Sequence, residues 1–215
     1  MRYIHSLIIA AIFCAVATLT EAEDLSSSPL YKVDPTPRAT GSFYENRMEV
    51  SFETAQLFDV GGGDIIYHVA PQIVALHWQL DDIGNEGWLR GNTEFIFSGY
   101  FTPVIEGIES RYTGGLFGPR YNFVQEGWDW VPYLESRVGF GFTDSRARQR
   151  GEGQGQDFFF TFTVGVGAKY IINDHANLSL GLIYQHISNA GLSEPERTNY
   201  GLDTLGPIVS FSYGF

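Results

Sequence analysis

Apolar and polar residues alternate along much of the chain after residue 41. In the stretch 210–215, aromatic residues alternate with serine and glycine, and in 158–167, phenylalanine and valine alternate mainly with threonine and glycine. Successive side chains of a β-strand project to opposite faces, so this period of two predicts strands with one large apolar face and one small or polar face.

The alternating segments are separated by runs of glycine, aspartate and asparagine, which are typical of turns. Eight segments are expected, at approximately 42–59, 66–80, 88–102, 110–124, 129–143, 157–172, 176–188 and 202–215. Most of them exceed the roughly 5–6 residues of a soluble strand and approach or exceed the roughly 9–11 residues of a tilted membrane strand. The sequence therefore predicts an all-β fold, an eight-stranded antiparallel transmembrane β-barrel over residues 41–215. Its apolar face would contact lipid and its small residues would fill a narrow lumen, with a soluble lipocalin-like barrel as the alternative.

The first 22 residues have the features of a secretory signal peptide. A basic residue, Arg2, precedes a largely apolar stretch that ends near Leu19, and small residues stand where cleavage after Ala22 is expected. This stretch is shorter than the roughly 20 residues of a membrane-spanning helix, which makes a retained anchor the weaker interpretation. The only cysteine, Cys14, lies within it, so the mature chain is expected to have no disulfide or thiolate chemistry.

Residues 23–40 are polar with three prolines, which predicts an N-terminal segment with little regular structure.

Charge and the terminal segments narrow the classes of partner and the location of the protein. The formal net charge of -12 argues against a nucleic-acid partner, because phosphate binding needs a basic surface. A secretory signal and a final aromatic segment ending at Phe215, which resembles the assembly signal of bacterial outer-membrane barrels, favour the outer membrane as the location.

The number of segments also predicts an orientation. With both ends of the barrel in the periplasm, odd segments run outward and even segments return. Turns near residues 83, 126 and 174 would then face the periplasm, and the longer loops 145–156 and 189–201 would face outside. This agrees with the short periplasmic turns and long external loops of such barrels.

A histidine and a serine stand two residues apart at the end of the seventh segment, in Tyr184-Gln185-His186-Ile187-Ser188. Residues i and i+2 of a strand share a face, so the imidazole would lie beside the hydroxyl, as a general base and a nucleophile require. Asp203 opens the last segment and could orient the histidine. The parity of both segments places His186, Ser188 and Asp203 on the apolar faces, toward lipid at the outer end of the barrel.

Such a trio suits the hydrolysis of an acyl ester. Ser188 would attack the carbonyl, His186 would take its proton and return it to the leaving alcohol, and Asp203 would hold the imidazole tautomer. Asn189 and Gly191 are candidate oxyanion donors. A lone His-x-Ser pair is a weak signal, and interfacial polar residues are common at a barrel rim, so a purely structural role is the alternative.

The run His186-Ile187-Ser188-Asn189-Ala190-Gly191-Leu192, followed by Pro195 and by Gly201-Leu202-Asp203, resembles the signature of the outer-membrane lipid A 3-O-deacylase family. The resemblance implies an eight-stranded barrel with an outward-facing site, with His186 as base, Ser188 as nucleophile, and Asn189 with Gly191 at the oxyanion site. It implies lipid A, or the lipopolysaccharide that contains it, as substrate, with the ester-linked acyl chain at the 3-position as the bond cleaved. No cofactor is implied, and a homodimer is left open.

The sequence departs from the family pattern at the acidic residue. The best-known form has a glutamate after a tighter loop, whereas here Asp203 follows a longer loop, 194–200. Aspartate is one methylene shorter, so the acid that orients His186 is left open between Asp203 and two loop residues, Glu194 and Glu196. Two other functions also remain open, a non-catalytic structural or adhesive barrel and an outer-membrane phospholipase.

Other conspicuous residues carry weaker signals. Arg146, Arg148 and Arg150 could contact lipopolysaccharide phosphates, with a solvated loop as the alternative. The glycine-rich run 151–155 lacks the Lys-Ser/Thr pair of a phosphate loop, so a flexible loop is expected there.

The remaining histidines and the tryptophans have structural interpretations. No metal-site spacing with acids or cysteines is found around His68, His77 and His175. Interfacial aromatic girdles are expected near strand ends, which is where the sequence places Trp78, Trp88, Trp128 and Trp130.

Overall fold

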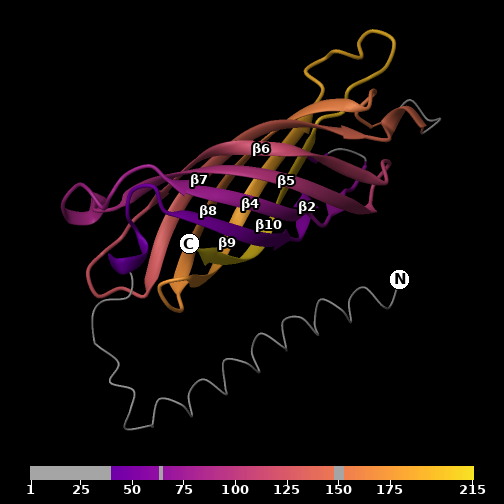
Figure 1. The fold of residues 1–215 in the computed structure, drawn as a ribbon. Coiled ribbons are helices and arrows are strands. Elements are labelled where there is room, and N and C mark those ends of the chain that lie inside the picture. The colour runs from indigo at the N-terminus through magenta and orange to yellow at the C-terminus, as the bar shows by residue number, and fades with distance from the viewer. Residues whose placement is uncertain (1–39, 63–64, 148–152) are drawn as a thin grey trace. The chain divides into compact units, whose positions relative to one another are not determined.

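The computed structural model describes residues 40–62, 65–147 and 153–215, which form a closed antiparallel β-barrel (Figure 1). The expected signal peptide, 1–22, and all but the last residue of the polar segment 23–40 lie outside the described residues. No helix in the described part of the chain is long and apolar enough to cross a membrane.

Eight barrel strands close on themselves. The described strands are β1 (Met48–Ala55), β2 (Leu57–Asp59), β3 (His68–Val69), β4 (Gln72–Gln79), β5 (Asn92–Glu106), β6 (Arg111–Asn122), β7 (Trp130–Thr143), β8 (Phe158–Ile171), β9 (Ala176–Ser188) and β10 (Leu202–Gly214). Both β1 and β2 pair with β10, so β1 and β2 together make one interrupted barrel strand. Both β3 and β4 pair with β5, so β3 and β4 together make a second one. Pro71 lies at the second interruption, where its missing N–H cannot continue the ladder. The predicted eight-stranded barrel is thus confirmed.

Strand boundaries differ most from prediction at the first and third barrel strands. The first strand begins at Met48 instead of 42, after a 3-10 turn at Thr40–Ser42. β5 runs over Asn92–Glu106 instead of 88–102, because Gly87–Leu89 forms a 3-10 turn before it. The turn expected to be short near residue 83 is consequently a long connection, 80–91, and the β5–β6 connection at the opposite end is tight, 107–110. The loop 189–201 projects from the end opposite the C-terminus (Figure 1).

The two faces of the wall alternate as predicted. In β10 the odd-numbered residues from Leu205 onward are exposed, whereas the even-numbered ones are buried in the lumen. Pro207 does not disturb this parity, because it stays in register with Leu182 of β9. In β8, three large side chains face inward together with the small ones and are fully buried: Phe159, Lys169 and Ile171.

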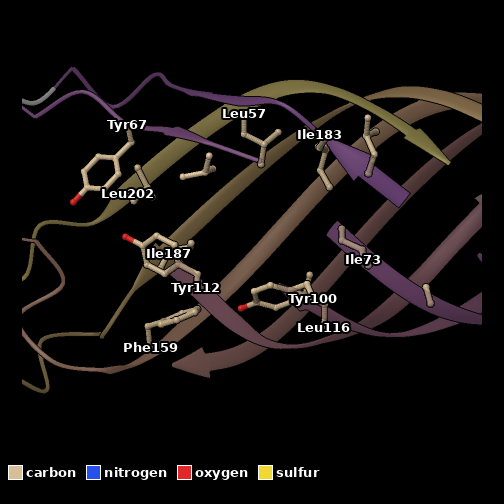
Figure 2. Close-up of a cluster of buried hydrophobic side chains, with 14 of the residues drawn as sticks. Leu57, Tyr67, Ile73, Tyr100, Tyr112, Leu116, Phe159, Ile183, Ile187 and Leu202 are labelled. Atoms are coloured by element: carbon tan, nitrogen blue, oxygen red, sulfur yellow. The ribbon is translucent and has the colours of Figure 1, made fainter. Parts of the chain in front are cut away.

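Apolar side chains fill the lumen toward the end that carries the loop 189–201. They point toward one another from several strands (Figure 2). This lumenal apolar cluster comprises Ala55, Leu57, Tyr67, Val69, Ile73, Ala75, Ile96, Tyr100, Tyr112, Leu116, Phe159, Ile183, Ile187, Leu202 and Ile208. A cavity of about 10 Å³ within it would hold about one water molecule.

The other half of the lumen holds a network of buried charges, where small residues alone were expected. This lumenal ion network comprises Arg47, Glu49, Glu53, His77, Glu94, Arg120, Glu135, Arg137 and Lys169. Small inward residues leave space for the long ones: a Cβ at Gly165 would lie 3.1 Å from Cγ of Glu135. Nη1 of Arg137 contacts Oε2 of Glu53 at 3.0 Å, and its Nη2 contacts Oε1 of Glu135 at 3.1 Å.

Removing one member of the lumenal ion network is expected to destabilise the barrel. Arg137→Ala should lower the free energy of unfolding by about 3–5 kcal/mol, because buried Glu53 loses its arginine partner and buried Glu135 loses one of its two. Urea unfolding in detergent, followed by the heat-dependent gel mobility of the barrel, measures the change. Glu126→Gln is the control: it breaks the Arg90–Glu126 pair, 3.8 Å long with Glu126 82% exposed, and should cost less than about 1 kcal/mol. Equal losses in the two variants would contradict a stabilising role for the network.

Candidate active site

His186 and Asp203 face each other on adjacent strands of the outer wall. They are direct cross-strand partners in the β9–β10 ladder, so their side chains project side by side. Nδ1 of His186 lies 2.7 Å from Oδ1 of Asp203, and the two side chains are 30% and 33% exposed. On the other side, Phe162 of β8 packs its ring 5.2 Å from the imidazole. The imidazole is therefore held between an acid and an aromatic ring.

Tyr184 is a second hydrogen-bond donor to the carboxylate of Asp203. It lies on the same face of β9, and its hydroxyl donates a hydrogen bond to the same Oδ1 of Asp203. An ionised carboxylate can only accept hydrogen bonds, so Nδ1 of His186 carries the proton in its contact with Asp203. The free lone pair is then on Nε2, the nitrogen that can act as a base. The sequence placed Tyr184 on this face by parity but gave no sign of its bond to Asp203.

Ser188 ends β9 on the same outer face as His186. Its Oγ accepts hydrogen bonds from the backbone N–H of Ala190, at 3.2 Å, and from Nδ2 of Asn199, at 3.0 Å. Within the described residues, the ring of His186 is not among the hydrogen-bond partners of this hydroxyl. A hydroxyl has two lone pairs and one proton. Both lone pairs of Ser188 are occupied, which leaves its proton available to a base on the same face.

Asn189 and Gly191 form hydrogen bonds within the loop that follows Ser188. The side chain of Asn189 is fully buried, and its Nδ2 donates to the carbonyl of Gln154 at 2.5 Å and to Oγ of Ser193 at 2.7 Å. Its Oδ1 accepts the backbone N–H of Gly191 at 2.8 Å. Both candidate oxyanion donors are therefore engaged within the loop in this arrangement.

Gln154 joins the β7–β8 loop to the loop that follows Ser188. It is fully buried, although a flexible loop was expected at this position. Its backbone N–H donates to Oε1 of Glu109 at 2.9 Å, its Nε2 donates to the carbonyl of Tyr200 at 2.9 Å, and its own carbonyl accepts from Asn189. The described part of the glycine-rich stretch thus packs against the site, and its composition alone gave no sign of this.

A buried acid, Glu109, holds the β7–β8 loop through the backbone N–H of Gln154. Oε2 of Glu109 accepts hydrogen bonds from Tyr67, at 2.7 Å, and from Tyr112, at 2.9 Å. Burial, together with the adjacent charge of Glu109, raises the pKa of Tyr67, so this phenol remains a donor. A Cβ at Gly153 would lie 2.3 Å from Oε1 of Glu109, and its φ of +94° also favours glycine. The backbone can approach this closely only without a side chain.

The other candidate residues lie apart from this arrangement. Glu194 and Glu196 are exposed, and of the acids in the described residues only Asp203 contacts the ring of His186. Arg146 is exposed, whereas Arg148 and Arg150 lie outside the described residues. No group of three metal-ligating side chains gathers in the part of the chain that the structure describes.

The three other histidines of the described residues each have a structural neighbour. His68 stacks on Phe58, His77 belongs to the lumenal ion network, and His175 stacks on Tyr213. The tryptophans lie at the barrel end opposite the site, in or beside strand ends and connections, and all are exposed: Trp78, Trp88, Trp128 and Trp130.

The sequence profile of the family described as "Lipid A 3-O-deacylase (PagL)" matches residues 72–212, about two thirds of the chain. The chain belongs to the lipid A 3-O-deacylase family. Membership identifies this deacylase-family chain as a hydrolase of the outer membrane. The matched region contains His186, Ser188 and Asp203.

Three solved structures resemble this deacylase-family chain to different degrees. The crystal structure of the outer membrane enzyme PagL matches with a TM-score of 0.51 and 19% identity, over 75% of this chain and 97% of that chain. A de novo designed transmembrane β-barrel matches with a TM-score of 0.41 and 11% identity, over 81% and 99% of the two chains. The outer membrane protein OprG from Pseudomonas aeruginosa matches with a TM-score of 0.41 and 11% identity, over 81% and 98%. No curated protein matches the chain by sequence.

Proposed function

We propose that this chain hydrolyses the ester-linked acyl chain at the 3-position of lipid A, with Ser188 as nucleophile, His186 as general base and Asp203 as the orienting acid. The observation that carries the proposal is the 2.7 Å contact between His186 and Asp203 on the outer wall, two residues from Ser188. A site inside the barrel, or one that faces only water, would not suit this substrate, because the acyl esters of lipid A lie at the membrane surface.

The proposed reaction passes through an acyl-enzyme. Oγ of Ser188 forms a bond to the ester carbon as its proton moves to Nε2 of His186, and the carbonyl electron pair moves onto oxygen. When this intermediate collapses, the bond to the sugar oxygen breaks, and His186 returns the proton to that oxygen. Water, activated by His186 in the same way, then releases the fatty acid from Ser188. Asp203 stabilises the imidazolium that forms in each step.

The surroundings of the site support an acyl substrate. In the β8–β9 ladder Phe160 is opposite Ser188 and Phe162 is opposite His186, and both phenylalanines are exposed on the outer wall. Leu182 continues this apolar surface along β9, two residues before Tyr184. An acyl chain in the lipid could lie along these side chains while its ester group stays at the polar rim.

The test is the structure of lipid A in cells that make the protein. The full-length chain is expressed in a Gram-negative host whose lipid A carries a hydroxyacyl ester at the 3-position, with the empty vector as control. Mass spectrometry should show a lipid A species lighter by one hydroxyacyl group, and fragmentation should place the loss at the 3-position. Heat-dependent gel mobility verifies that the barrel is folded.

The alternatives give different products in the same cells. Unchanged lipid A together with new lysophospholipids would replace the proposal with a phospholipase. Unchanged lipid A and unchanged phospholipids, with a folded barrel, would favour a structural or adhesive protein. Loss of an acyl chain from another position would keep the hydrolase but overturn the stated regiochemistry.

A further inference from the structure

A cleft of about 590 Å³ lies at the end of the barrel where the tryptophans gather, opposite the candidate active site. Trp88, in the connection 80–91, and Trp128, in the connection 123–129, both line it. Their side chains are 77% and 49% exposed. We call this feature the Trp88–Trp128 cleft.

Side chains from both connections hold the cleft together. Nε2 of Gln125 donates a hydrogen bond to the carbonyl of Gly87 at 3.2 Å. In the other direction, Nη1 of Arg90 donates to the carbonyl of Val124 at 2.5 Å. The connection 80–91 is the long one that strand periodicity did not predict, and these bonds fix it against its neighbour.

The apolar floor of the cleft belongs to the outer wall of the barrel. It is formed by Phe123 and Pro132, and the backbone N–H of Phe123 donates to the carbonyl of Pro132 at 2.8 Å. The residues just before them, Asn122 and Val131, are fully buried in the lumen. Alternation therefore places both apolar residues on the lipid side. Because tryptophans are typical of the membrane–water interface, the cleft lies at the level of the lipid headgroups.

One cation and one anion line the same cleft. Nη2 of Arg90 lies 3.8 Å from Oε1 of Glu126, whose side chain is 82% exposed. This distance is too long for a hydrogen bond, and an ion pair with an exposed partner contributes little stability. Among the described residues, no hydrogen bond engages Nη2 of Arg90. The two charges can therefore separate at little cost to admit a ligand that carries both signs.

The surroundings of the cleft select against an anionic ligand. Arg90 is the only basic residue of the two connections, whereas five acidic residues are exposed there: Asp81, Asp82, Glu86, Glu126 and Asp129. A headgroup with net negative charge would meet these acids. A zwitterionic headgroup offers them an ammonium and offers the guanidinium a phosphate, and both contacts are charge-assisted hydrogen bonds.

We propose that the Trp88–Trp128 cleft binds a zwitterionic phospholipid of the phosphatidylethanolamine class, from the leaflet on the periplasmic side. Nη2 of Arg90 binds the phosphate, and the carboxylate of Glu126 accepts a hydrogen bond from the ammonium. The glycerol and the first part of the acyl chains lie against Trp128, Phe123 and Pro132. This lipid site is separate from the candidate active site.

Native mass spectrometry of the folded full-length barrel tests the selectivity. The protein, in a nonionic detergent, is mixed with equal concentrations of phosphatidylethanolamine and phosphatidylglycerol that carry the same acyl chains. The first lipid retained by the wild type should be phosphatidylethanolamine, in about tenfold excess, the scale of one hydrogen bond to a charged group. Glu126→Gln should abolish this preference, because a neutral amide does not attract the ammonium. Glu86→Gln, an exposed acid of the same connection that does not line the cleft, is the matched control and should keep it.

Two further variants test the phosphate contact and the aromatic wall. Arg90→Gln should lower the retention of both lipids by about tenfold, since both carry a phosphate. Trp88→Ala should also lower the retention of both. Trp130→Ala, an exposed tryptophan of the same barrel end outside the cleft, should retain lipid as the wild type does. Heat-dependent gel mobility verifies that each variant is folded.

Three outcomes would overturn the inference: equal retention of the two lipids by the wild type, an unchanged preference in folded Glu126→Gln, or equal losses in Trp88→Ala and Trp130→Ala. The last would assign lipid binding to the aromatic girdle as a whole. Ser188 takes no part in these measurements. Failure of the lipid site therefore leaves the proposed function standing, and a protein inactive on lipid A leaves the lipid site standing.

Discussion

Ser188→Ala is expected to lower kcat for lipid A deacylation by a factor on the order of 10⁶, the scale on which a triad serine contributes. The variant removes the oxygen that forms the acyl-enzyme bond, and no second hydroxyl of the described residues contacts His186 in its place. Release of the hydroxy fatty acid from lipid A in detergent, measured by mass spectrometry, quantifies the loss.

The barrel of Ser188→Ala should stay folded. The hydroxyl is half-buried, so the N–H groups of Ala190 and Asn199 that lose their acceptor can bond to water. Ser110→Ala provides a matched control, since this exposed serine lies in the β5–β6 connection and bonds to Asp144. Wild-type activity is expected there. A Ser188→Ala variant that retained a tenth of wild-type kcat would place the nucleophile elsewhere.

Asp203→Ala is expected to lower kcat by about 10⁴-fold. Without the carboxylate, nothing selects the tautomer in which Nε2 of His186 is free, and nothing stabilises the imidazolium. Tyr184 cannot replace the acid, because its hydroxyl is itself a donor to Asp203. The measurement is steady-state deacylation in detergent, with the KM determined separately to show that the loss falls on kcat.

Two matched variants decide which acid orients the histidine. Glu194→Gln and Glu196→Gln remove the other candidate carboxylates, which are exposed in the loop between β9 and β10. Both should retain wild-type kcat. A large loss in either of them, with little loss in Asp203→Ala, would move the orienting role from the strand to the loop.

Strand periodicity accounts for what the sequence predicted well. The eight-stranded barrel is confirmed, and the outward placement of His186, Ser188 and Asp203 follows from parity alone, because alternate residues of a strand always share a face. The lumenal ion network was missed for a different reason. Glu53 and Arg137 are 84 residues apart, and they meet only when the barrel closes.

Strand periodicity does not predict the contacts that loops make. Parity ends at Ser188, so the contacts of Asn199 with Ser188 and of Gln154 with Asn189 had no periodic signal in the sequence. The second contact depends on how the β7–β8 loop, held on Glu109, packs against the loop that follows Ser188. The length of the connection 80–91 was missed likewise, because a 3-10 turn at Gly87–Leu89 follows no alternating pattern.

The packed lumen determines how a substrate meets this enzyme. With the lumenal apolar cluster and the lumenal ion network filling the interior, the barrel formed by the described residues has no passage that can deliver or remove a lipid. Lipid A must arrive sideways, within its own leaflet, and the fatty acid and the shortened lipid must leave by the same plane. The frequency of encounters is therefore set by two-dimensional diffusion and by the number of lipid A molecules per unit of membrane area, and the concentration of substrate in the surrounding water has no part in it.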